Sequence, residues 1–262
     1  MGIRSSRRIT RRFADKLLCL ALDVGEGLLK SGAEIHRVEE SINMICHAYG
    51  AAHVEVFAIT SLIVASIRLS NNDYSVQMRR IHHSSNHLLK IEEFNSISRK
   101  ICLETPPLNE FEAMIQNAKR KTNSPPAFHI LGGMLAAGAF TVVFGGSLLD
   151  AFVAAMMGLI VVLSDFVHVK NIGPTAKCVL ASFLCGMLTC TLVHFGIGNN
   201  EHKIMIGTIM LLIPGLAFCN SLRDMIDGDI IAGVFRFVQS CLTAVMIAVG
   251  FGLAIFISGV LL

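Results

Sequence analysis

Five apolar segments in the second half of the chain constrain its fold more than any other feature. They cover roughly residues 127–146, 148–167, 177–196, 203–219 and 230–262. Each is close to or above the ~17 to 25 residues that an α-helix needs to span a bilayer. Small residues let membrane helices approach closely, and the candidates here are Gly132, Gly133, Gly138 and Gly158. The sequence therefore predicts an α-helical integral membrane protein with about five transmembrane helices.

The charged residues are concentrated in the first half of the chain. Residues 1–126 hold 17 of the 22 Lys and Arg residues and 13 of the 19 Asp and Glu residues. The mean hydropathy of +0.62, with 53% hydrophobic residues, is too high for an ordinary soluble domain of 262 residues. We therefore predict two domains: a small cytoplasmic α+β domain over residues 1–126, and a transmembrane domain over residues 127–262.

The loops between the apolar segments differ in positive charge. The loop at residues 145–147 holds no positive residue. The loop at residues 198–203 holds one lysine, Lys203, whose charge is balanced by that of Glu201. Positive residues gather before the first segment, between the second and third, and between the fourth and fifth: Lys119, Arg120, Lys121, Lys170, Lys177 and Arg223. By the positive-inside rule, this predicts a multi-pass protein of the inner (cytoplasmic) membrane, with the N-terminus in the cytoplasm and the C-terminus outside.

The fourth apolar segment is interrupted by Pro214-Gly215. Proline removes a helical hydrogen bond, and backbone left open at membrane depth is tolerated only against protein or a water-filled cavity. Both a simple kink and a discontinuous helix that presents its ends to a solute fit this pattern. Polar residues that could line a solute or ion path follow the break: Asn220, Arg223, Asp224 and Arg236. The neighbouring Asp227 and Asp229, like Asp224, are expected in a cytoplasmic loop and need not be buried.

Two ionisable residues lie within or beside apolar segments. Asp165, near the inner end of the second segment, fits either an interfacial position or a path-lining role. Arg236, near the start of the fifth, either extends to the cytoplasmic interface or pairs with a partner from elsewhere. Asp224 folding back, an acidic residue of another helix, and an anionic solute are the candidate partners.

The first 126 residues contain segments with the apolar spacing of helices and segments with that of β-strands. Apolar residues at helical spacing predict helices over residues 13–28, 35–45, 88–101 and 111–118, and β-type runs cover residues 53–59, 62–69 and 74–81. The tetrapeptide Ser31-Gly32-Ala33-Glu34 has the S-x-x-E form of a capping box, which favours a structural role for Glu34 as a helix cap over a catalytic one. Arg37 and Glu39 follow in the same motif, which we interpret as structural.

Other classes of function lack their sequence signatures. The chain has no nucleophile elbow, no zinc-protease motif and no phosphate-binding loop, so no catalytic residue and no cofactor is predicted. His82, His83 and His87 lack the cysteine or carboxylate partners that would complete a metal site. The net charge of +3 is too small to predict binding to nucleic acid.

Several motifs, in order along nearly the whole chain, resemble the threonine/serine exporter family, and specifically its YjjP-like subunits. They are Ser31-Gly32-Ala33-Glu34 with Arg37-Val38-Glu39-Glu40, His53-Val54-Glu55-Val56, Phe144-Gly145-Gly146-Ser147 with Asp150, and Ile213-Pro214-Gly215 with Asn220, Arg223-Asp224, Gly228-Asp229, Gly233 and Arg236. The resemblance implies export of small polar metabolites, either threonine and serine or dicarboxylates such as succinate. It also implies a separate, small YjjB-like membrane subunit as partner, and thus an oligomer.

Two alternatives to a transport role remain at this point. The first is a membrane-tethered enzyme or sensor that works through its N-terminal domain, with Glu34, Arg37, Glu39 and Glu40 as the acidic and basic cluster. The second is a noncatalytic assembly subunit of a complex in which another protein carries the solute.

Overall fold

The computed structural model describes residues 10–69, 72–82, 85–120, 125–166 and 173–261. By its internal contacts the chain divides into two compact units. The first unit comprises Met1–Asn123 together with Leu216–Phe237, and the second comprises Ser124–Gly215 together with Val238–Leu262. Their common boundary near Ser124 is close to the predicted one at residue 126. Residues 216–237, however, group with the N-terminal unit and not with the apolar helices to which the sequence assigned them.

The first unit is built on a small antiparallel sheet. Its strands, β1 (Val54–Ile59), β2 (Leu62–Arg68) and β3 (Tyr74–Arg80), lie in the order β1-β2-β3. The register pairs Phe57 with Val64 and Val64 with Met78. The three predicted β-type runs are therefore confirmed, with ends that differ by one residue.

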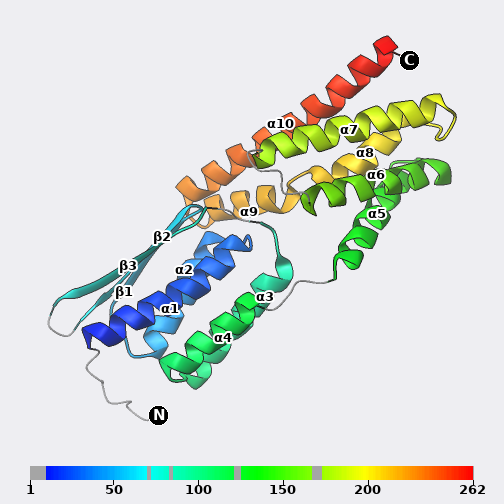
Figure 1. Cartoon of the computed structure of the whole chain (residues 1–262). Coiled ribbons are helices and arrows are strands. Elements are labelled where there is room, and N and C mark those ends of the chain that lie inside the picture. The colour runs from blue at the N-terminus through cyan, green and yellow to red at the C-terminus, as the bar shows by residue number, and fades with distance from the viewer. Residues whose placement is uncertain (1–9, 70–71, 83–84, 121–124, 167–172, 262) are drawn as a thin grey trace. The chain divides into compact units, whose positions relative to one another are not determined.

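Helices cover one face of this sheet (Figure 1). They are α1 (Arg11–Lys30) and α2 (Ile35–Ala48), with α3 (Leu88–Glu104) and α4 (Leu108–Arg120) packed on the side of α1 away from the sheet. The core between these layers holds fully buried side chains that include Leu17, Leu18, Leu22, Ile35, Ile42, Ile63, Ile67, Ile101 and Phe111. Of these, Leu17, Ile35, Ile42, Ile101 and Phe111 belong to the apolar spacing that predicts the four helices, and Ile63 and Ile67 lie on β2.

The described residues of the second unit form helices joined by short loops, with no strand among them. It contains α5 (Pro126–Val143), α6 (Leu148–Phe166), α7 (Pro174–His194), α8 (Glu201–Leu212) and the later part of α10 (Ile230–Leu261). Helices α5 and α6 form its most extensive contact. A Cβ added at Gly158 would lie 2.8 Å from the carbonyl oxygen of Gly133, so only glycine permits this approach. The predicted role of Gly133, Gly138 and Gly158 in helix contacts is confirmed, whereas Gly132 faces open space.

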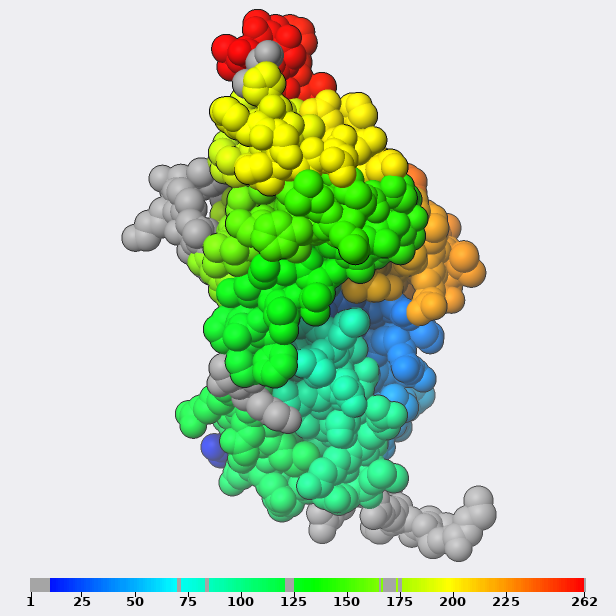
Figure 2. Space-filling model, turned by 90° about the vertical axis from the view of Figure 1, so that its right-hand side faces the viewer, coloured from blue at the N-terminus to red at the C-terminus, as the bar shows by residue number. Residues whose placement is uncertain are grey.

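The outer surface of the second unit is apolar. Figure 2 shows α5 and α6, in green, forming a continuous surface. Large apolar side chains are exposed along these two helices: Phe128, Leu131, Leu135, Phe140, Val143, Leu148 and Phe152. Such a surface is unfavourable in water and favourable in lipid.

The number of membrane spans depends on how the broken helix is counted. Among the described residues, three helical stretches are long and apolar enough to cross a membrane: Pro126–Val143, Ala176–His194 and Ile230–Leu261. Helices α8 and α9 (Gly215–Ile226) pass the same test only as a pair, and α6 contributes a shorter apolar stretch, Leu148–Ser164. All five predicted apolar segments are thus helical over most of their length. The count of five spans stays a prediction.

Candidate functional site

A short turn between α1 and α2 organises the first candidate site. Helix α1 ends at Lys30, and Gly32 follows with a φ of +89°. The amide of Gly32 donates to the carbonyl of Leu29, and the amide of Ala33 donates to that of Leu28, each over 3.1 Å. This pair of bonds with glycine in the left-handed region is a Schellman motif, which ends a helix.

The capping box predicted at Ser31 and Glu34 is therefore wrong. The hydroxyl of Ser31 donates backwards to the carbonyl of Gly27, 2.7 Å away, and so belongs to the end of α1. Glu34 itself occupies the residue before α2, and its side chain caps no backbone amide there. Side chains from far along the chain form hydrogen bonds with the backbone groups of this turn instead.

Asp224 caps the N-terminus of α2 from α9. Its Oδ1 accepts a hydrogen bond from the amide of Ile35, the first residue of α2, over 3.1 Å. The side chain of Asp224 is completely buried. A carboxylate at this position satisfies an amide that has no partner within its helix, and its charge complements the positive end of the helix dipole. The expectation that Asp224 lies in a loop and need not be buried is wrong, because this cap holds it inside the unit.

Arg236, on the first turns of α10, completes the cluster. Its Nη1 lies 3.0 Å from Oδ2 of Asp224, and its Nη2 donates to the carbonyl of Ala33 over 3.4 Å. Of the partners considered from the sequence, the structure brings Asp224 to this arginine. Only 12% of the Arg236 side chain is exposed, so both members of the pair are largely removed from water.

Two further side chains of α9 hold the same turn. Asn220 donates from Nδ2 to the carbonyl of Gly32 over 3.1 Å, and Arg223 forms an ion pair with Glu34. We define the turn clamp as the eight residues that make these contacts: Gly32, Ala33, Glu34, Ile35, Asn220, Arg223, Asp224 and Arg236. The clamp contains two carboxylates and two guanidinium groups, and so its charges balance.

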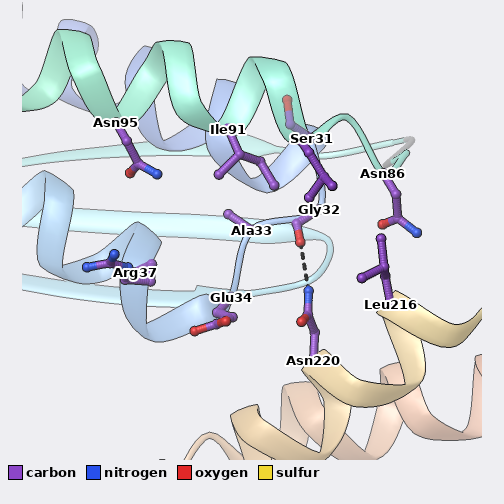
Figure 3. Close-up of a pocket in the computed structure, with 11 residues that line it drawn as sticks. Ser31, Gly32, Ala33, Glu34, Arg37, Asn86, Ile91, Asn95, Leu216 and Asn220 are labelled. Atoms are coloured by element: carbon purple, nitrogen blue, oxygen red, sulfur yellow. Dashed lines mark hydrogen bonds between the residues drawn. The ribbon is translucent and has the colours of Figure 1, made fainter.

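A pocket of about 240 Å³ opens beside the turn clamp (Figure 3). Polar side chains of Glu34, Asn86, Asn95 and Asn220 line it, together with the apolar Ile91 and Leu216 and others of the turn. The single bond drawn across it is the one from Asn220 to Gly32. Arg37 lies at its rim, where it pairs with Glu40 at 3.5 Å with most of its side chain exposed. The pocket is wide enough for a small polar molecule.

Glu39 joins α2 to the sheet. Its Oε1 accepts from the amide of Ala58 in β1 over 2.6 Å. Partial burial raises the pKa of Glu39 above its usual value, although this hydrogen bond acts in the opposite direction. A contact of this kind between two elements of one unit supports the structural interpretation of Glu39.

Pro214, Gly215 and Asp165 lie outside the turn clamp. Helix α8 ends before an extended Ile213, and α9 begins at Gly215, so the predicted interruption of the helix is confirmed. Asp165 lies in the last turn of α6, but its side chain is outside the described residues. Among the described residues no group of three or more His, Cys, Asp or Glu side chains could hold a metal ion, and His83 lies outside them.

A second polar cluster lies in the second unit, around Ser147 and Asp150. These two residues enter the sequence-based prediction only as part of a family motif. Asp150, 1% exposed, accepts from the amide and hydroxyl of Ser147 at 2.9 Å and 2.8 Å. Its other oxygen accepts from the amides of Asn199 and Asn200 at 2.6 Å and 3.1 Å. Ser147 and Asp150 thus form a capping box at the start of α6, which also ties down the loop before α8. The S-x-x-D spacing in the sequence could have revealed this half of the cluster.

The conformation of Gly32 gives a test of the turn. We expect Gly32→Ala to lower the free energy of unfolding by about 1–2 kcal/mol or more, because a side chain is unfavourable at positive φ. Its Cβ would also lie 2.6 Å from Oδ1 of Asn86. Gly50→Ala is the matched control, since Gly50 has a φ of +92° with nothing within 4 Å of its Cβ position. Thermal unfolding of the full chain should show the larger loss for Gly32→Ala, and an equal or larger loss for Gly50→Ala would contradict the crowded turn.

The class of protein that the structure defines agrees with the family to which the chain is similar. The two units, with helices of membrane-spanning length and a broken helix followed by buried charges, define a multi-pass membrane protein with a polar N-terminal unit. The model of the threonine/serine exporter family matches residues 19–258. The chain belongs to that family. The resemblance drawn from the sequence motifs is thereby confirmed at the level of the family, and a family of exporters agrees with the prediction that the chain is not an enzyme.

One curated relative is a threonine/serine exporter from Corynebacterium glutamicum. It is 24% identical over 254 residues, which are 92% of this chain and 51% of the relative. The chain therefore spans about half the length of the relative that it matches. No solved structure matches the chain.

Proposed function

We propose that the chain is one half of a secondary exporter for small polar metabolites, with threonine and serine as the first candidate solutes. The observation that carries this proposal is the family match over residues 19–258, which includes the turn clamp and the helix break at Pro214-Gly215. Dicarboxylates such as succinate are the second candidate class. No feature of the described residues favours the alternative of an enzyme or sensor.

A separate small membrane subunit of the YjjB type is the partner that we propose, as the resemblance to YjjP-like subunits implies. The match to 51% of the curated exporter is compatible with such a partner. Secondary transporters commonly place their solute site at the interface between two related halves. The proposed complex is thus a hetero-oligomer in the inner membrane, with the N-terminus in the cytoplasm, the C-terminus outside, and about five spans in this chain.

The path for the solute would use the broken helix and its neighbours. Pro214 and Gly215 leave backbone groups open to a polar solute, and Asp165 would lie near one end of the path. Asn220, Arg223 and Asp224 follow the break within three helical turns of α9 and belong to the first unit.

Excretion from intact cells tests the solute class. Cells that lack this chain and its partner would be loaded in turn with threonine, serine and succinate, with and without expression of both proteins. We expect faster excretion of threonine and serine when both are present. Faster excretion of succinate alone would reassign the solute to the dicarboxylates, and no acceleration for any of the three would refute the proposal.

The assembly role is separated from transport by variants of the clamp. Arg223→Gln removes an exposed ion pair and should leave the complex assembled, since such pairs contribute about 0–1 kcal/mol. Lost export with preserved assembly would favour a role for the clamp in transport. Loss of both together would favour a scaffold.

A further inference from the structure

The sheet of the first unit has an outward face that carries apolar residues. Alternation along the strands points Val56, Ala65 and Ser75 toward the helices, and their neighbours outward. Seven of the eleven outward residues are apolar or aromatic: Phe57, Ile59, Leu62, Val64, Tyr74, Val76 and Met78. An antiparallel sheet that faces water on one side normally has polar residues there. This outer face therefore departs from the expected pattern.

The apolar residues form one continuous patch across all three strands. Phe57 pairs with Val64, which pairs with Met78, so one row crosses the sheet at its middle. The side chains of Phe57 and Met78 are 57% and 67% exposed, and that of Val76 is 56% exposed. Apolar patches of this kind on a folded surface mark contact sites more often than scattered apolar residues do.

Arginine residues lie at the two ends of the patch. Arg80 stands opposite Leu62 at one end, and Arg68 stands opposite Tyr74 at the other. Both arginine residues are exposed, and Glu55 is the one acidic residue on the face. An apolar centre with aromatic side chains and a basic edge is the composition of a surface that lies on anionic lipid headgroups.

The size of the face argues against a second copy of the chain as its occupant. Strands of up to seven residues, three abreast, give an area of roughly 24 Å by 14 Å, or on the order of 340 Å². A stable protein interface buries about 800 Å² on each partner. Contact with a bilayer needs a smaller buried area than this. The apolar helices hold the unit near the membrane, and such tethering raises the effective concentration of the contact.

We propose that the outer face of this sheet, centred on Phe57, Val76 and Met78, lies on the surface of the membrane and contacts anionic lipid. Tyr74 and Phe57 would enter the interfacial region, and Arg68 and Arg80 would contact the headgroups. The contact would fix the orientation of the first unit relative to the bilayer. This proposal does not depend on which solute is exported.

The sequence contains no tryptophan, so the fluorescence of a single introduced tryptophan reports on its own position alone. Single variants Val76→Trp and Met78→Trp would each place one tryptophan on the outer face of the full chain. The matched control is Leu103→Trp on α3, where the native side chain is 82% exposed. The three proteins would be reconstituted in vesicles of phosphatidylcholine and phosphatidylglycerol with bromine-labelled acyl chains. Circular dichroism would confirm that each variant keeps the helical content of the parent.

We expect the labelled lipid to quench the fluorescence of the Val76→Trp and Met78→Trp proteins strongly, and that of the Leu103→Trp protein little. Because each arginine contributes about fivefold to binding at an anionic surface, Arg68→Gln with Arg80→Gln should weaken the quenching, as should added salt. Equal quenching at all three positions, or none, would overturn the proposal. Blue-shifted emission at positions 76 and 78 without quenching by lipid would also overturn it, because a protein would then cover the face.

Discussion

Replacement of Asp224 by alanine is expected to lower the free energy of unfolding by about 3–5 kcal/mol, the range for breaking a buried ion pair from one side. The variant leaves the guanidinium of Arg236 largely buried without the carboxylate that lies 3.0 Å away. It also removes the acceptor for the amide of Ile35 at the start of α2. The loss should appear in thermal unfolding of the full chain in detergent.

The control for this variant is Asp227→Ala. Asp227 is exposed and lies just beyond the end of α9, so its loss should change the free energy of unfolding by less than about 0.5 kcal/mol. A double variant, Asp224→Ala with Arg236→Ala, should be less destabilised than the sum of the two single variants, because the residues contact each other. Strict additivity, or an equal effect of the control, would show that the pair does not couple α9 and α10 to α2.

Replacement of Asp150 by alanine is the second variant with a large expected effect. The carboxylate accepts four hydrogen bonds, three of them from backbone amides, and it is 1% exposed. Because hydrogen bonds to a charged acceptor contribute about 1.5–3 kcal/mol each and are not additive, we expect a loss of about 3 kcal/mol or more. Thermal unfolding and limited proteolysis of the loop before α8 would both report it.

A graded series gives this prediction its control. Asp150→Asn keeps acceptor oxygen but loses charge, and Ser147→Ala removes only the hydroxyl of the capping box. The expected order of destabilisation is Asp150→Ala, then Asp150→Asn, then Ser147→Ala. If Ser147→Ala were as damaging as Asp150→Ala, the link to Asn199 and Asn200 would contribute nothing measurable.

Local patterns predicted the elements of the fold well. The alternation of Tyr74, Val76 and Met78 with polar residues specifies a strand, and the structure has β3 from Tyr74 to Arg80. Pro214 has no amide hydrogen, and the helix ends just before it. In both cases the cause lies within a few residues of its effect.

The turn clamp could not be predicted from local patterns, because its members are far apart in sequence. Asp224 and Ile35 are separated by 189 residues, and no local periodicity connects a carboxylate in α9 with the first amide of α2. Two local signals compete at Ser31: Lys30 followed by Gly32 indicates the end of a helix, whereas the S-x-x-E pattern indicates the start of one. The same kind of pattern at Ser147 and Asp150 has no glycine between its members, and there it does form a capping box.

Residues 216–237 fall within the predicted transmembrane domain of residues 127–262, but their contacts group them with the first unit. Ala232 packs in the core of that unit, and Asp224 is buried there. Helix α10, with 32 residues, is about 48 Å long and exceeds the ~30 Å of a hydrocarbon core. One end of this helix must therefore extend beyond the bilayer, and its first turns, which carry Arg236, belong to the first unit.

Efflux from reconstituted vesicles measures whether this chain and its partner together export threonine. Vesicles loaded with radiolabelled threonine would contain this chain alone, the YjjB-like partner alone, both proteins, or neither. If the chain is half of an exporter, efflux should rise above that of empty vesicles only when both proteins are present, and Asp224→Ala should reduce it. Efflux as fast from the chain alone as from the pair, or no faster from the pair than from empty vesicles, would show that the chain is not half of a threonine exporter.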